Sequence, residues 1–86
     1  MRVFAPYTTQ GLWALSFGAD SALAHDLAEG VAIVALHYRV PPHRAARLLA
    51  EALVERASET GALSDARHAR EACGRAAALE ALRHIE

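Results

Sequence analysis

Apolar residues recur at helical spacing in the middle of the chain. Between residues 21 and 38 the main row is Leu23, Leu27, Val31, Val34 and Tyr38. Steps of three and four residues place these side chains on one face of a helix. A second apolar row, mostly alanine, runs beside the first, so both rows need a covering element. We predict a central helix over residues 21–38.

The same spacing returns after a pair of prolines. Pro41 and Pro42 favour extended backbone in the residues before them, so the central helix must end near residue 38. Pro42 suits the first turn of a new helix, because that turn does not need its amide hydrogen. We predict a helix over residues 42–59 with an inward row of Ala45, Leu48, Leu49, Ala52 and Leu53.

Two more helices are expected towards the ends of the chain. Residues 9–17 hold four large apolar side chains between a threonine that would cap a helix and a glycine that would end it. Residues 65–85 follow Ser64, a good cap, and carry a row of small apolar residues. The predicted fold is therefore all-α: one domain, residues 1–86, a small bundle of about four helices over residues 9–17, 21–38, 42–59 and 65–85.

Composition agrees with a small helical domain. The hydrophobic fraction of the 86 residues is 53%, and 21 of them are alanine, the strongest helix former. A chain of this length buries only about 60% of the surface that it exposes when unfolded. Association of subunits would add buried surface, and we expect a homodimer to which residues 65–85 contribute.

Charge excludes a strongly basic or acidic protein. Nine arginines, without any lysine, stand against ten carboxylates, so the formal net charge is −1. Attraction to nucleic acid must therefore be local. Residues 37–47 supply such a place, because they contain three arginines, two histidines and no carboxylate.

Three further features bear on compartment and membrane association. Cys73 is the only cysteine, so no disulfide can form within the chain and a reducing compartment is favoured. The N-terminal residues lack the apolar run of a signal peptide. The most apolar segment, residues 31–36, is far shorter than a membrane span. We expect a soluble, cytoplasmic protein that does not associate with membranes.

Residues 31–50 match six positions of a helix-turn-helix pattern. Counted from Val31, the pattern has a small residue at the fifth place, where the two helices touch, and apolar residues at five other places. Ala35 is the small residue. The apolar ones are Val34, Tyr38, Val40, Ala45 and Leu48. This stretch resembles the DNA-binding part of bacterial helix-turn-helix regulators.

The resemblance implies a function and a set of DNA-contacting residues. The ninth place, usually a glycine in a left-handed turn, is Arg39, at a cost of about 1 kcal/mol. Arg47 would pair with guanine, while Arg39, His43 and Arg44 would meet phosphates. The predicted function is that of a small non-enzymatic transcriptional regulator that binds double-stranded DNA. The residues that the resemblance places towards the groove are Pro41, Pro42, His43, Ala46 and Arg47.

A second interpretation stays open. The chain could instead be a small helical protein that binds another protein, as an antitoxin, an anti-activator or a phage-encoded inhibitor does. Near-neutral charge and the surplus of apolar rows favour this alternative. Arg47 could then form a solvated ion pair with Glu51, four residues further along the helix.

Other chemistry is not expected. His25 with Glu29, His68 with Glu71 and Glu80 with His84 are pairs at helical spacing, but they stand among solvent-facing charges and predict no metal site. Cys73 is expected to be a small core residue. We find no phosphate-binding glycine loop, nucleophile elbow or buried carboxylate pair. The sequence thus predicts neither an enzyme nor a cofactor.

Overall fold

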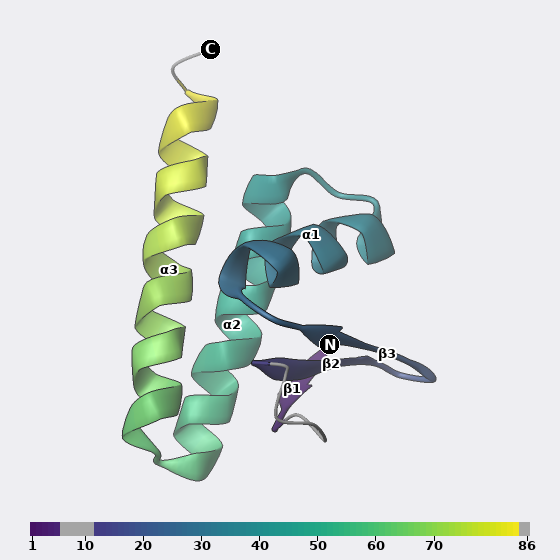
Figure 1. Cartoon of the computed structure of the whole chain (residues 1–86). Coiled ribbons are helices and arrows are strands. Elements are labelled where there is room, and N and C mark those ends of the chain that lie inside the picture. Colours follow the sequence, from purple (N-terminus) through teal and green to yellow (C-terminus); the bar gives the residue numbers. More distant parts are fainter. Residues whose placement is uncertain (6–11, 85–86) are drawn as a thin grey trace.

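The described part of the chain folds as three strands followed by three helices (Figure 1). The computed structural model describes residues 1–5 and 12–84. The predicted all-α bundle of four helices is wrong, because residues 2–4, 13–17 and 20–24 form a sheet. The elements are β1 Arg2–Phe4, β2 Trp13–Phe17, β3 Asp20–Ala24, α1 Leu27–Tyr38, α2 Pro42–Thr60 and α3 Leu63–Arg83.

The sheet is an antiparallel meander in the order β1-β2-β3. Leu15 of β2 pairs with Val3 on one side and with Ala22 on the other. A two-residue turn, Gly18 and Ala19, joins β2 to β3, and Gly18 has φ +82°, as the first position of a type II′ hairpin turn requires. Alternate residues therefore point to one face, where Val3, Trp13, Leu15 and Ala24 are buried.

The error over residues 13–24 has a physical cause. Trp13, Leu15 and Phe17 alternate with smaller residues, which is the two-residue period of a strand. The alanines of this stretch favour a helix locally, but pairing between strands and burial of one face decide the outcome. Residues 9–11 of the predicted first helix lie outside the described residues.

Helix α1 starts later than the sequence predicted. Asp26 is its cap: its side chain accepts a hydrogen bond of 2.7 Å from the amide of Glu29. The Glu29 carboxylate accepts a bond from the His25 amide and lies 2.6 Å from His25 Nδ1. The predicted helix over residues 21–38 is thus wrong for its first part, where residues 21–24 belong to β3.

The hydrophobic core lies between the sheet, α1 and the N-terminal and middle turns of α2. Leu15, Val34 and Leu49 are among its largest fully buried side chains. Gly30 lets α1 approach closely, since a Cβ added there would stand 3.0 Å from Leu49 Cδ2 and 3.7 Å from the Trp13 ring. On its other side α2 forms an antiparallel hairpin with α3, which contributes the buried Ala69 and Ala72 (Figure 1).

One polar network joins three elements. Asp65, near the start of α3, accepts hydrogen bonds from Arg56 Nε (3.1 Å) and Thr60 Oγ1 (2.6 Å), both on α2. Arg56 Nη1 also donates to the Val3 carbonyl of β1 at 3.3 Å. The hydroxyl of Thr60, followed by the guanidinium of Arg56, lowers the pKa of Asp65.

Candidate nucleic-acid interface

The corner between α1 and α2 presents Arg39. This residue has φ 55° and ψ 49°, the left-handed conformation, and it ends α1 with its amide directed to the Ala35 carbonyl. Pro41 is extended, and Pro42 is the first residue of α2. The chain thus makes a corner in which α1 crosses α2 steeply (Figure 1), and the exposed Arg39 lies in the connection between the two helices.

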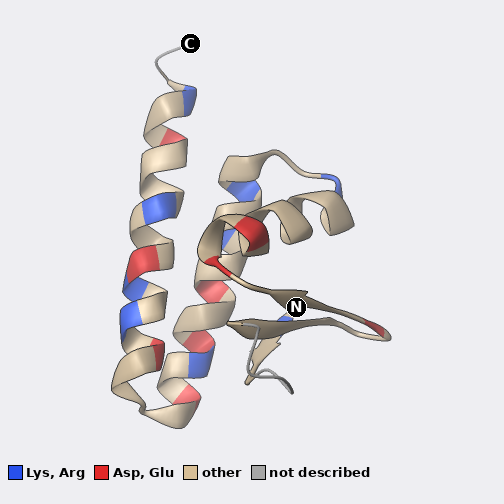
Figure 2. Cartoon of the chain, viewed as in Figure 1, with Lys and Arg blue, Asp and Glu red and all other residues tan. Residues whose placement is uncertain are grey.

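Arg44 and Arg47 extend this basic surface along the first turns of α2. Both are exposed, and three residues of separation place them on one face of the helix. Neither they nor Arg39 form an ion pair with any residue in the ranges 1–5 and 12–84. Figure 2 shows basic residues at the corner and the start of α2, and carboxylates further along the helix. We call Arg39, Arg44 and Arg47 the corner arginines.

His43 belongs to a different environment from the corner arginines. Its side chain is largely buried against α3, with Nε2 4.0 Å from Glu80 Oε2 and 3.4 Å from Arg83 Nη1. Glu80 also lies 3.2 Å from Arg83 Nη1 and 3.6 Å from His84 Nε2. Of the four predicted site residues, the three arginines are therefore exposed, and His43 packs against the end of α3.

Burial at the start of α2 limits which side chains reach a base edge. Ala46, which the helix-turn-helix resemblance places towards the groove, is only 1% exposed. Leu48 and Tyr38, expected inward, are 36% and 40% exposed, whereas Val34 and Ala45 are fully buried. The exposed face at the start of α2 thus offers Arg44 and Arg47 with Leu48, a set suited to phosphates more than to bases.

A basic hollow lies between the start of α2 and the end of α3. Its volume is about 370 Å³. Its α3 residues, Glu80 and Arg83, are not among the residues predicted from the sequence to contact DNA. The residues that line it are His43, Arg44, Arg47, Leu48, Glu80 and Arg83.

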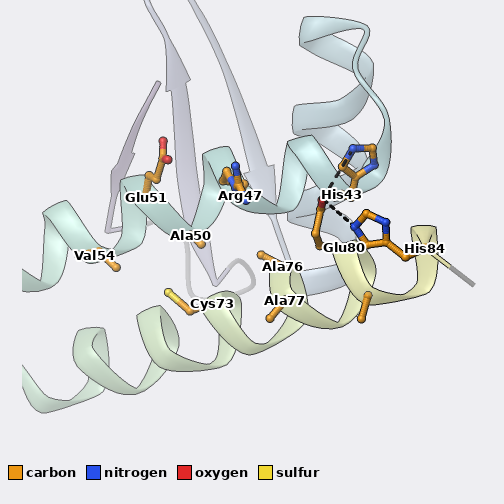
Figure 3. A pocket seen from close by; sticks show the side chains of 11 residues that line it. His43, Arg47, Ala50, Glu51, Val54, Cys73, Ala76, Ala77, Glu80 and His84 are labelled. Carbon is orange, nitrogen blue, oxygen red and sulfur yellow. Dashed lines mark ion pairs between the residues drawn. The ribbon is translucent and has the colours of Figure 1, made fainter.

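An apolar groove continues from the basic hollow along the α2–α3 hairpin (Figure 3). Its volume is about 720 Å³. Alanines, Val54 and Cys73 form most of its walls, and His43, Arg47 and Glu80 line both the groove and the hollow. Cys73, expected in the core, is exposed instead. Figure 3 shows Glu80 between His43 and His84 at the basic end.

The described part of the chain holds neither a cluster suited to a metal ion nor a helix suited to span a membrane. Among residues 1–5 and 12–84, no three histidine, cysteine or carboxylate side chains are grouped so that they could hold a metal ion. None of the helices over these residues has the length and apolar character needed to cross a membrane.

Comparison with known proteins gives no relative. No protein-family model, curated protein or solved structure matches this chain. Function must therefore be argued from the corner, the hollow and the groove themselves.

Proposed function

We propose that this protein binds double-stranded DNA through its α1–α2 corner, with the corner arginines on the phosphates. The observation that carries the proposal is that Arg39, Arg44 and Arg47 are exposed together and form no ion pair with a described carboxylate. Guanidinium groups match phosphate oxygens in geometry and charge, and release of counterions from DNA favours the contact.

In the proposed binding mode the protein contacts the DNA backbone more than the edges of the bases. Ala46 is buried and His43 packs against α3, so neither of these two residues, which the resemblance places towards the groove, is free to contact a base edge. Such a protein would act by occupying DNA, as a small transcriptional regulator in the cytoplasm does, without catalysing a reaction. Its preference among DNA sequences is expected to be weak.

Removal of two corner arginines tests the proposal. The R44A/R47A variant is expected to bind a short duplex about ten- to a hundredfold more weakly than the unaltered chain at moderate salt, because two charge-assisted contacts are lost. Fluorescence anisotropy of a labelled duplex measures this change. Both positions are exposed, so helix content by circular dichroism should stay the same.

A matched control uses two arginines outside the corner. Arg67 and Arg75 are exposed on α3 and form no ion pair with another described residue. The R67A/R75A variant removes the same charge and is expected to bind like the unaltered chain. Equal loss in both double variants would contradict a specific role for the corner.

A second candidate function, association with another protein, is favoured by the apolar groove. We propose that its occupant is a second copy of this chain. The exposed face of α2 is positive at Arg44 and Arg47 and negative at Glu51 and Glu55. Two copies with antiparallel α2 helices would therefore bring opposite charges together, while Val54 and the groove alanines meet between them.

Sedimentation velocity tests the second candidate. The unaltered chain should sediment as a dimer, and V54D should sediment as a monomer, because a carboxylate would be buried in the groove without a partner. L36D is the control, since Leu36 is an exposed apolar residue of α1 outside the groove. A monomeric unaltered chain at high concentration would exclude this association.

The two candidate functions use Arg44 and Arg47 in mutually exclusive ways. An antiparallel dimer pairs Arg44 and Arg47 with carboxylates of the second copy, so duplex binding should weaken as the protein concentration rises. The first candidate requires these arginines to stay free. The apparent affinity for a labelled duplex, measured at several fixed protein concentrations, separates the two candidates: it falls with protein concentration in the second and not in the first.

A further inference from the structure

We propose that the basic hollow is a binding site for one phosphate monoester group, held by Arg44 and Arg47 of α2 and by Arg83 of α3. The inference rests on the proposed function for its use of Arg44 and Arg47, and it adds Arg83 and a defined recess. It names terminal phosphates as the preferred ligand, whereas the proposed function concerns the phosphodiesters of the DNA backbone.

The charge within the hollow is unbalanced. Among the described residues, three guanidinium groups line it together with a single carboxylate, that of Glu80. Glu80 is also shared, because Arg83 and His84 approach its Oε1 at 3.2 and 3.6 Å and His43 approaches its Oε2 at 4.0 Å. About two positive charges are left without an anionic partner among residues 1–5 and 12–84, and an anion that enters the recess lowers their mutual repulsion.

The arrangement of donors favours phosphate over a carboxylate. One guanidinium satisfies a carboxylate with two parallel hydrogen bonds, which leaves the other arginines unused. A phosphate monoester has three terminal oxygens and a charge of about −1.5 to −2 at pH 7, so it matches both the number of arginines and the excess charge. A phosphodiester carries one charge and two free oxygens, and it matches less well.

The hollow is also built from rigid elements. Arg44 and Arg47 stand on the first two turns of α2, and Arg83 stands on the last turn of α3. The antiparallel α2–α3 hairpin holds these two ends together, and His43 lines the recess between them, close to Glu80 and Arg83. A volume of about 370 Å³ lies within the range of about 300–1,000 Å³ for pockets that hold small ligands.

Titration with inorganic phosphate tests the site directly. Amide resonances of the full chain are followed by NMR while phosphate replaces chloride at constant ionic strength. Signals of residues 43–47 and of Arg83 are expected to shift in a saturable way. R83A should weaken phosphate binding about tenfold or more, and R75A, which removes an exposed arginine elsewhere on α3, should leave it unchanged. Shifts that do not saturate, or that are the same in R83A, would overturn the proposal.

A second arm identifies the source of the phosphate. A duplex with 5′-phosphates and the same duplex with 5′-hydroxyls are compared by anisotropy. If the site takes nucleic-acid ends, the phosphorylated duplex binds several-fold more tightly, and R83A abolishes that difference. If inorganic phosphate saturates the site and the two duplexes bind equally, the proposal stands with a small phosphorylated molecule as the ligand.

The two proposals fail in different ways. Saturable, Arg83-dependent phosphate binding without any duplex binding would remove the proposed function and keep the phosphate site. Duplex binding that depends on the corner arginines, without saturable phosphate binding, would keep the function and remove the site.

Discussion

Replacement of Leu49 by alanine is expected to lower the free energy of unfolding by about 3–4 kcal/mol. Leu49 is fully buried where α1, α2 and the sheet meet, and its Cδ2 atom occupies the space left open by Gly30. The substitution leaves a cavity that the closely packed neighbours can fill only in part. A domain of this size has a total stability of about 4–13 kcal/mol, so the loss is a large share of it.

Urea denaturation followed by circular dichroism measures this effect. The midpoint should fall while the slope of the free energy against urea stays the same. L48A is the matched control: Leu48 is the neighbouring leucine, is 36% exposed, and should cost less than about 1 kcal/mol. Equal losses at the two positions would show that α2 is rotated relative to the arrangement described above.

Removal of the Asp65 carboxylate is expected to cost about 2–3 kcal/mol at pH 7. Asp65 is 8% exposed, and D65A would leave Arg56 largely buried without its anionic partner and Thr60 without an acceptor. Arg56 also binds the Val3 carbonyl, so the loss should loosen β1 as well. E71A, which removes an exposed carboxylate of the same helix, should change stability little.

The contribution of Asp65 depends on pH with a definite sign. Its pKa in the folded chain is lowered, chiefly by the Thr60 hydroxyl and then by Arg56. The stabilisation is therefore complete above the unfolded pKa of about 4 and is lost as the pH falls through the folded value. The stability difference between the unaltered chain and D65A should shrink below about pH 4. A difference that stays constant from pH 7 to 2.5 would contradict the assignment.

The boundaries of the helices are set by local sequence signals. Pro41 and Pro42 separate α1 from α2, and Gly61, with φ +66°, ends α2 where a left-handed residue is needed. The sheet is different, because its signal is spread over short segments that are stable only when paired. The alternation of Trp13, Leu15 and Phe17 marks β2, but alanine-rich neighbours with high helix propensity conceal it.

The candidate site could be predicted in part for the same reason. The exposure of Arg39, Arg44 and Arg47 follows from helical periodicity and from a corner rich in proline. The burial of Ala46 could not be predicted in this way. It depends on the wide buried face of α2, which packs against both α3 and the core. The approach of Arg83 to His43 depends on the short connection between α2 and α3, which brings residues 40 positions apart together.

The central claim, that the corner arginines bind DNA phosphates, is tested most directly by the salt dependence of duplex binding. Three phosphate contacts predict that the logarithm of the association constant falls with the logarithm of salt concentration with a slope of about −2.7. In R44A/R47A the slope should fall to about −0.9, and in R67A/R75A it should stay near that of the unaltered chain. Absence of duplex binding at low salt, or a slope that R44A/R47A leaves unchanged, would contradict the claim.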